Sequence, residues 1–329
     1  MAKGPNQKLK LIYLMKILLE MTDDEHSLTL AEILQELARY DITAERKSIY
    51  TDFESLRVYG LDIISEQRNR TVYYHVGSRD FEIAELKLLV DAVQSSKFIT
   101  EKKSRELIKK LESFASKYEA KELHRRVYVQ GRIKTMNESI YYNVDKIHEA
   151  IGKNVQIEFQ YYQWNVKKEM ELRHNGAFYK ISPLELMWDD ENYYLVGYDS
   201  KAGIMKHFRV DKMLKINLLE DKREGKEVFE KLDMAAYSKK RFGMFDGMEQ
   251  TVKLECENHF AGVIIDRFGK EVSMRKIDDE HFVTNVEVAV SRQFIGWVIA
   301  LGPGVKVIGP ENVVAHIQEE IERLIKQYR

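Results

Sequence analysis

Residues 43–56 have the sequence TAERKSIYTDFESL, which predicts a helix with one apolar and one polar face. At about 100° per residue, Phe53 and Leu56 lie within roughly 40° of Ile49, so these three side chains form a core stripe. We expect the neighbouring Asp52 to face another helix and to be structural. The polar face carries cations, hydroxyls and an aromatic ring, from Arg46, Lys47, Ser48, Tyr50 and Thr51.

Residues 8–59 as a whole predict three helices. In the first, apolar residues recur every three or four positions, as on a buried helix face: Leu11, Leu14, Met15 and Leu18. The second begins after Thr29, because Thr29 and Glu32 have the spacing of a capping box. For the third helix we expect Thr43 as the N-cap and Glu45 as a favourable charge in the first turn.

The pattern changes from helical to strand-like after Gly60. Residues 62–66 and 71–76 are rich in β-forming residues and flank the polar tip at residues 67–70. Three helices followed by a hairpin predict a winged helix-turn-helix, which we assign to residues 1–78.

The polar helix face and the hairpin tip predict contacts with double-stranded DNA. Cations and hydroxyls near a helix N-terminus suit base edges and phosphates in a major groove, and cations on a hairpin tip suit a minor groove. The predicted DNA-contacting residues are Arg46, Lys47, Ser48, Tyr50, Thr51, Arg68 and Arg70. An ordinary three-helix bundle with a polar surface is the alternative. The domain has 12 acidic and 10 basic residues, and this net charge of −2 favours the alternative.

The composition of the chain restricts its class. The 329 residues include 52 Lys and Arg and 53 Asp and Glu, so a polybasic nucleic-acid wrapper is excluded and any such role needs a local patch. A single cysteine, Cys256, allows no intrachain disulfide and indicates a reducing cytoplasm. No apolar run is long enough for a membrane span or reads as a signal peptide, so we expect a soluble cytoplasmic protein with no membrane partner.

Residues 79–140 are predicted to form a helical linker in which positive charge accumulates. Residues 81–117 have helical periodicity, and the helix is expected to continue to about Arg126. Between Lys97 and Lys134 there are 12 basic and 5 acidic residues, a net charge of 12 − 5 = +7. This stretch is either a second phosphate-contacting surface or a solvated helix face with many i,i+4 pairs.

The second half of the chain predicts two further modules. After a helix at residues 144–152, short strands with turn signals predict a small, strongly bent sheet or barrel, at residues 155–161, 177–181, 193–198, 207–210 and 214–219. From residue 251 the pattern predicts an α/β unit with strands at 251–256, 282–290 and 305–308, and helices at 291–300 and after Pro310.

Several segments resemble bacterial winged-helix regulators that precede a WYL domain. The match runs through residues 42–56 and 81–86 and is strongest at ISPL (181–184), NYYLVGYD (192–199) and HFRVDKM (207–213), with Tyr193 in place of the name-giving Trp. GWVIALG (296–302) and PENVV (310–314) resemble the C-terminal extension of the family. The resemblance implies an α+β protein with a winged helix-turn-helix (1–78), a helical linker (79–140), an Sm-like β-barrel WYL domain (141–235) and an α/β extension (236–329).

The resemblance also implies a function. It implies a transcriptional regulator that binds DNA as a homodimer and senses a nucleotide or oligonucleotide effector in its WYL domain. The effector contacts carried over are Tyr161, Ser182, Tyr194, His207 and Arg209. Alternation in a strand places His207 and Arg209 on one face, where an arginine fork suits a phosphate or carboxylate. The alternative is that Arg209 pairs with Asp211 or Asp199 and that the tyrosines are core residues.

Nothing in the sequence predicts catalysis, a cofactor or a metal site. Cys256 and His259 are three residues apart, but Cys256 ends an apolar alternation and is expected to fill the core. The acidic runs 189–191 and 278–280 are expected to be polar turns, and residues 302–304 lack the Lys and Ser/Thr of a phosphate loop. The competing functional hypothesis is an RNA- or small-molecule-binding accessory protein whose helix-turn-helix mediates protein contacts.

Overall fold

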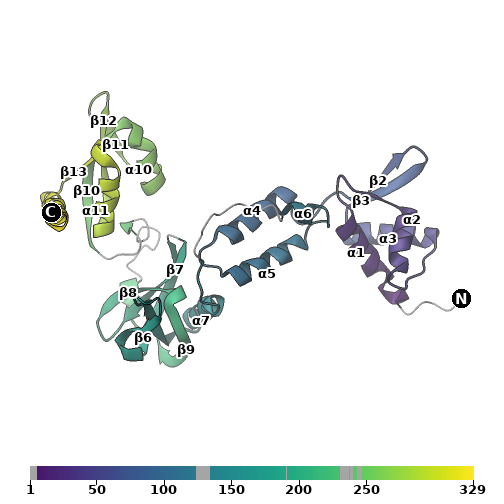
Figure 1. Cartoon of the computed structure of the whole chain (residues 1–329), viewed down its shortest axis with the longest axis horizontal. Helices are drawn as coiled ribbons and strands as arrows, with labels where there is room; N and C mark the ends of the chain where they lie inside the picture. Colours follow the sequence, from purple (N-terminus) through teal and green to yellow (C-terminus); the bar gives the residue numbers. More distant parts are fainter. Residues whose placement is uncertain (1–5, 124–133, 190, 230–236, 238–239, 243–246) are drawn as a thin grey trace. The chain divides into compact units, whose positions relative to one another are not determined.

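The computed structural model describes residues 6–123, 134–189, 191–229, 237, 240–242 and 247–329. The chain divides into two compact units, Met1–Glu138 and Ser139–Arg329, and mixes helices with sheets in both (Figure 1). No helix among the described residues is long and apolar enough to cross a membrane.

The first unit begins with three helices and a small sheet. A 3-10 turn at Gln7–Leu9 precedes α1 (Lys10–Met21), α2 (Leu30–Ala38) and α3 (Arg46–Tyr59). The hairpin of β2 (Ile63–Arg68) and β3 (Thr71–Val76) is joined by β1 (Leu28–Thr29), which the sequence did not predict, in the order β1-β3-β2. The capping box of α2 is confirmed, because Thr29 accepts from the Glu32 amide and Glu32 accepts from the Thr29 amide.

The expected N-terminus of α3 was wrong. Glu45 is the N-cap, without a side-chain cap hydrogen bond, and Thr43 lies in the extended segment before it. The predicted core stripe is confirmed, since Ile49, Phe53 and Leu56 are buried against α1, α2 and the sheet. Tertiary packing of that stripe, rather than a capping side chain, therefore determines where α3 starts.

The linker consists of separate helices, α4 (Ile83–Ser95), α5 (Glu101–Glu112) and α6 (Glu119–Leu123), instead of one continuous stretch. The chain turns at Ser96, which is extended, and Thr100 caps α5 by accepting from the Lys103 amide. Lys134 donates to the carbonyls of Val93 and Ser96 at the end of α4. The predicted continuation to Arg126 lies outside the described residues beyond Leu123.

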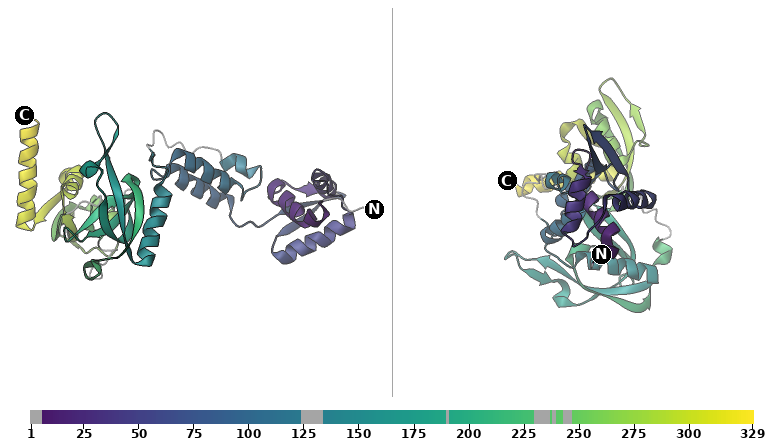
Figure 2. Two further views of the ribbon diagram at one scale, coloured as in Figure 1. Left: turned by 90° about the horizontal axis from the view of Figure 1, so that it is seen from below. Right: turned by 90° about the vertical axis from the view of Figure 1, so that its right-hand side faces the viewer.

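The second unit begins with α7 (Ile140–Lys153) and a curled sheet (Figures 1 and 2). Its strands are β4 (Val155–Trp164), β5 (Met170–Leu172), β6 (Tyr179–Asp189), β7 (Asn192–Asp199), β8 (Ile204–Arg209) and β9 (Met213–Lys222). They run in the order β5-β4-β6-β7-β8, and β9 also pairs with β4, so the sheet folds back on itself as a half-barrel. A register shift between Pro183 and Glu185 bends β6 at the corner.

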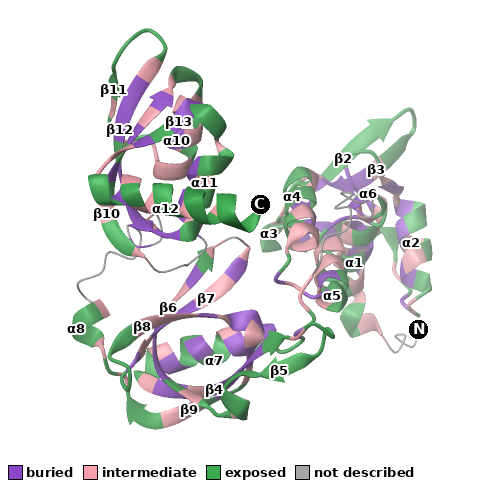
Figure 3. Ribbon diagram, turned by 60° about the vertical axis from the view of Figure 1, so that its left-hand side comes forward, coloured by how far each residue is buried: buried purple, intermediate pink, exposed green. Residues whose placement is uncertain are grey.

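Two 3-10 turns and a short helix complete this module: η2 (Arg173–Gly176), η3 (Val210–Lys212) and α8 (Lys226–Phe229). All predicted strands are present, although most are longer than expected, and the three-residue β5 was not predicted. Asn154 ends α7 in the left-handed region, with φ of 56°, and the chain enters β4 directly. Figure 3 shows that buried residues recur along the strands of this sheet.

The C-terminal part is a four-stranded sheet with helices. Strands β10 (Met248–Glu257), β11 (Met274–Lys276), β12 (His281–Val290) and β13 (Val305–Gly309) run in the order β11-β12-β10-β13. The predicted helices are α11 (Arg292–Ala300) and α12 (Glu311–Gln327). The sequence missed α10 (Ala261–Phe268), whose eight residues are too short for a clear helical period, and β11.

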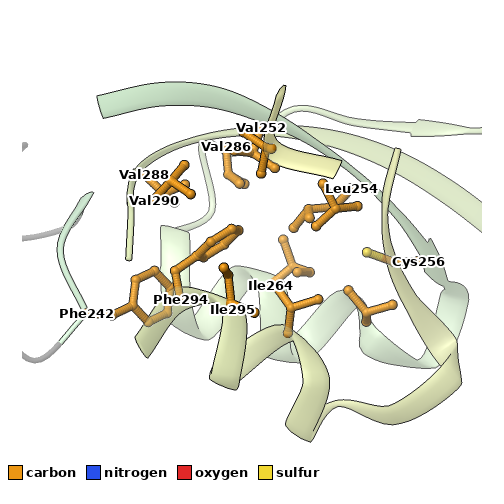
Figure 4. Close-up of a cluster of buried hydrophobic side chains, with 14 of the residues drawn as sticks. Phe242, Val252, Leu254, Cys256, Ile264, Val286, Val288, Val290, Phe294 and Ile295 are labelled. Carbon is orange, nitrogen blue, oxygen red and sulfur yellow. The ribbon is translucent and has the colours of Figure 1, made fainter. Parts of the chain in front are cut away.

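Cys256 fills the core of this C-terminal sheet, as expected. The side chain is fully buried beside Leu254 and Ile264 (Figure 4). Burial raises the pKa of the thiol to about 11, and the neighbouring Glu255 carboxylate acts in the same direction. The thiolate is therefore scarce at neutral pH, as well as shielded from reagents.

We predict that the native protein will not react with a thiol reagent such as 5,5′-dithiobis(2-nitrobenzoate) at pH 8. A pKa near 11 leaves about one thiol in a thousand ionised at that pH, and reaction further requires local opening. The chain has one cysteine, so the absorbance reports this site alone. The urea-unfolded chain is the control and should react within minutes. Rapid reaction of the folded chain would contradict the buried position.

Candidate nucleic-acid and effector sites

The polar face of α3 is exposed in its own domain. Arg46, Lys47, Tyr50 and Thr51 are all exposed. Lys47 and Thr51 lie opposite the core stripe, whereas Tyr50 is on its flank and Arg46 is near its edge. The Tyr50 ring lies edge-to-face on the buried Phe53, with 6.5 Å between the ring centroids, so this contact supports the position of the Tyr50 ring. The four side chains form one accessible surface with hydroxyl, aromatic and cationic groups, which is the chemistry that the sequence predicted for this face.

Ser48 differs from the other candidates on α3. It is half-buried, and its hydroxyl accepts from the ammonium group of Lys10 on α1. The same ammonium forms an ion pair of 2.7 Å with Asp52. The expectation that Asp52 faces a neighbouring helix is therefore confirmed, and Ser48 takes part in the same packing contact between α1 and α3.

The hairpin tip presents two arginines with different surroundings. Arg68 donates twice to Glu66, at 2.9 and 2.6 Å, and its guanidinium lies 5.2 Å from the centre of the Tyr73 ring. Arg70 is exposed, follows the left-handed Asn69 (φ of 57°) and forms no ion pair among the described residues. Arg70 is thus the better placed cation for an external phosphate, whereas Arg68 is partly neutralised by Glu66.

The charges of the linker divide into two groups. Lys103 pairs with Glu106, and Lys134 is directed into the carbonyls at the end of α4 and the Ser104 hydroxyl. The exposed cations on α5 are Lys102, Arg105, Lys109 and Lys110. The exposed cations fit a phosphate-contacting surface, and the Lys103–Glu106 pair fits a solvated helix face. Arg125, Arg126 and Arg132 lie outside the described residues.

Three of the five predicted effector residues share one face of the β7–β8 ladder. Tyr194 lies directly opposite Arg209, and Val196 lies opposite His207. Directly opposed residues of an antiparallel pair point to the same side of the sheet, so Tyr194, His207 and Arg209 project together. Strand alternation predicted that His207 and Arg209 share a face; the register confirms this and adds Tyr194 to the same face.

Arg209 has an internal partner, as the alternative interpretation proposed. Its guanidinium donates to both carboxylate oxygens of Asp211, at 3.0 and 2.9 Å. Asp199, the other partner considered, pairs instead with Lys206 at 2.6 Å. The Arg209 side chain keeps about a third of its surface exposed (36%), so its outer edge stays accessible beside Tyr194.

Tyr161 and Ser182 do not share the accessible surface of the other three. Tyr161 is buried among the rings of Phe159, Tyr179 and Phe208, and its hydroxyl accepts from the Arg209 amide at 3.1 Å. Burial raises the pKa of Tyr161 to about 12. The buried Ser182 hydroxyl accepts from the Glu224 amide at 2.8 Å. In this conformation both side chains support the sheet from within.

Two cations beside this region were missed by the sequence reasoning. Burial lowers the pKa of Lys212, and the positive charges of Arg209 and Arg173 lower it further, whereas Asp211 acts in the opposite direction. Lys212 is the last residue of η3, and Arg173 is the first residue of η2. Strand β4 pairs with β5 next to η2 and with β9 next to η3, which brings the two cations close together. A signal was present in the sequence, since Lys212 lies within HFRVDKM.

Tyr237 was also missed. It is buried on Met187 and Val196, and its hydroxyl lies 2.9 Å from Nε2 of His207. The Arg241 guanidinium stacks on its ring at 3.5 Å and pairs with Glu249 on β10 at 3.0 Å. Tyr237 therefore borders the candidate effector face, and Arg241 connects it to Glu249 at the start of the C-terminal sheet.

The described residues contain no group of three His, Cys, Asp or Glu side chains that could hold a metal ion. The acidic run 278–280 is a turn, as expected, in which Asp278 accepts from the amides of Glu280 and His281. In the run 189–191, Asp190 lies outside the described residues.

Comparisons with known proteins identify two modules. The model of the WYL domain matches residues 142–218, and that of the WCX domain matches residues 249–325. No curated protein matches the chain.

Two solved structures are similar at low identity. Proteasome accessory factor B/C of Arthrobacter aurescens is 16% identical, with 100% of this chain and 50% of that chain covered and a TM-score of 0.27. A CRISPR Cas-related protein is 14% identical, with 90% of this chain and 77% of that chain covered and a TM-score of 0.37. The chain thus spans about half the length of the accessory factor, and the assignment depends on the two domain matches. The chain therefore contains a WYL domain at residues 142–218, followed by a WCX domain at residues 249–325.

Proposed function

We propose that this protein is a cytoplasmic transcriptional regulator without catalytic activity. Residues 1–78 act as a winged helix-turn-helix, and two copies of the chain bind an operator with two-fold symmetry. The WYL domain, an Sm-like barrel in this proposal, senses an anionic nucleotide or oligonucleotide. The observation that carries the proposal is the exposed polar face of α3, where Arg46, Lys47, Tyr50 and Thr51 stand clear of the domain core.

The physical argument begins with the way α3 is held. The apolar stripe of α3 is fully buried, and Asp52, one of the acidic residues of this helix, is neutralised by Lys10. The hairpin carries the exposed Arg70 on the same small domain. A helix for a major groove and a cation for a minor groove are the two parts that groove recognition needs.

The test is binding of genomic fragments from the source organism against random DNA, measured by fluorescence anisotropy over a series of salt concentrations. We expect one or a few fragments to bind at least about a hundredfold more tightly than random DNA. Lys47→Gln should weaken binding, because one phosphate contact is lost. The slope of the logarithm of the binding constant against the logarithm of the salt concentration should become less steep by about 0.9. Lys16→Gln on α1, an exposed lysine paired with Glu20, is the matched control and should leave both unchanged. Equal binding to all fragments would contradict specific recognition.

The competing function is an accessory protein that binds RNA or a small molecule and uses the helix-turn-helix for protein contacts. The net charge of −2 in residues 1–78 and the Arg68–Glu66 pair favour it. Under this alternative, duplex DNA binding would be absent or would not respond to Lys47→Gln.

For the effector site we predict that Arg209→Ala lowers the free energy of unfolding by about 1–2 kcal/mol, because hydrogen bonds to a charged group are lost from a partly exposed pair. The replacement alone would therefore confound folding with sensing. The double variant Arg173→Gln/Lys212→Gln avoids this, since neither cation forms an ion pair among the described residues. It should reduce binding of a 5′-phosphorylated oligonucleotide and leave operator affinity unchanged, both measured by anisotropy. Unchanged oligonucleotide binding would mean that the anion site is elsewhere.

A further inference from the structure

We propose that a polar cluster around a buried carboxylate joins the helical linker to the first three helices, so that α3 and the linker move as one body. The cluster, here called the linker joint, consists of Asp23, His26, Arg79, Ser116, Lys117, Tyr118 and Glu119. It connects the end of α1 and the loop after it with the turn between α5 and α6. Every contact of the joint lies within the unit Met1–Glu138.

Asp23 is the centre of the joint. The residue is only 5% exposed. Its Oδ1 accepts from the amides of Glu25 and His26 and lies 2.7 Å from Nδ1 of His26. The other oxygen accepts from the hydroxyl of Ser116, 93 positions along the chain. Burial raises the pKa of Asp23, but the hydrogen bonds from Ser116 and His26 outweigh it, and the pKa lies below its usual value. Asp23 is therefore a charged hub at neutral pH.

Ser116 connects this hub to the start of α6. Its hydroxyl is fully buried, donates to Asp23 and accepts from the amides of Tyr118 and Glu119. The Glu119 carboxylate accepts in return from the Ser116 amide at 2.9 Å. One residue thus begins a linker helix and binds the buried carboxylate of the first domain, so the position of α6 is tied to that of Asp23.

The C-terminal end of α1 supplies a second set of contacts. Helix ends leave carbonyls without intrahelical partners. Arg79 donates to the carbonyls of Leu19 and Thr22, and its Nε lies 3.8 Å from the carboxylate of Glu119. The amide of Lys117 donates to the Glu20 carbonyl at 2.8 Å. The linker therefore provides part of the cap of α1.

A stacked ring pair completes the joint. His26 and Tyr118 lie face to face, with 3.6 Å between ring centroids and 4° between planes. The Lys117 ammonium lies 4.9 Å from the centre of the Tyr118 ring. These contacts fix the two segments in orientation as well as in distance.

The directionality of these contacts is what makes the joint a mechanical link. The two apolar clusters on either side share no residue: one contains Ile49, Phe53 and Leu56, and the other contains Leu86, Val90, Ala115 and Leu123. An apolar contact can slide at low cost, whereas breaking a hydrogen bond to a buried carboxylate leaves an unsatisfied charge. When the linker moves, α3 is therefore expected to move with it.

The experiment measures this rigidity directly in the full chain. Spin labels at Tyr59→Cys on α3 and Lys109→Cys on α5, in a Cys256→Ala background, report one distance distribution by double electron–electron resonance; both positions are exposed. We expect a single narrow distribution, and an increase in width of about twofold or more in Ser116→Ala and in Asp23→Asn. Asp24→Asn, which removes the exposed carboxylate next to Asp23 in the sequence, is the matched control and should keep the narrow distribution.

Hydrogen exchange separates loosening from unfolding. In Ser116→Ala, amides 117–119 should exchange about tenfold faster or more, while the amides of α2 and β3 keep their protection. A narrow distribution with unchanged exchange in both joint variants would overturn the proposal. A uniform loss of protection would show that the cluster serves stability alone and would also overturn it.

A further experiment depends on the proposed function. If the protein is an effector-responsive regulator, Ser116→Ala should retain operator binding but reduce the effector-induced change in affinity at least about fivefold. Absence of operator binding by the parent protein would count against the proposed function, whereas a normal response in Ser116→Ala would count against the joint.

Discussion

Phe294→Ala is expected to lower the free energy of unfolding of the C-terminal domain by about 3–5 kcal/mol, the usual cost of truncating a fully buried aromatic side chain. Phe294 is the first large apolar residue of α11, and its ring is within 5.4 Å of Phe242 and 6.4 Å of Trp297, centroid to centroid. Its amide also donates to the Ser291 hydroxyl that caps α11. The replacement leaves a cavity at the centre of the cluster formed by β10, β12 and α11.

Urea unfolding monitored by circular dichroism and tryptophan fluorescence tests this prediction, since Trp297 lies beside the cavity. Ile299→Ala on the same helix is the matched control, because Ile299 is 47% exposed and should cost about 1 kcal/mol or less. Similar losses in the two variants would mean that the α11 face is not packed as described.

Phe159→Ala is expected to have a comparable effect, about 3–5 kcal/mol, in the curled sheet. Phe159 is fully buried on β4, stacks on Tyr179 at 5.5 Å and meets the edge of Phe208 at 5.0 Å between centroids. Removal of this ring also withdraws support from Tyr161, whose hydroxyl accepts from the Arg209 amide. The loss should therefore reach the candidate effector face.

Two measurements distinguish these consequences. The free energy of unfolding follows from urea titration, and disturbance at Arg209 follows from chemical-shift changes of its amide in nuclear magnetic resonance spectra. Trp164→Ala, which truncates a half-exposed aromatic residue farther along β4, is the control and should affect both much less. An unaltered Arg209 amide in Phe159→Ala would argue against the role of Tyr161 as its support.

Helices and strands with a strong local period could be predicted, but their limits depended on contacts that the sequence does not display. The stripe of Ile49, Phe53 and Leu56 was evident from spacing, yet the start of α3 was placed at Thr43 instead of Glu45. A polar residue two positions earlier satisfies the local rule for an N-cap equally well, so packing against α1 and α2 decides between them. The short α10, β1, β5 and β11 carry too few periods to be recognised.

The candidate sites show the same division. Alternation placed His207 and Arg209 on one face, and only the β7–β8 register added Tyr194 opposite Arg209. Whether Arg209 pairs with Asp211 or Asp199 was open in the sequence, because both are within reach along the chain. The turn η3 settles it by directing Asp211 back toward Arg209, while Asp199 binds Lys206 across the hairpin.

The amino-acid sequence by itself determined the order of modules, the faces of the long helices and the motifs that the two domain models recognise, since all of these depend on residues close together in the chain. Tertiary structure alone decided which charges are used internally. Lys10 with Asp52, Arg209 with Asp211, and Asp23 with Ser116 are paired by the fold. The last pair joins residues 93 positions apart, and such a contact forms only when separate helices pack, because local periodicity carries no information about partners at that distance.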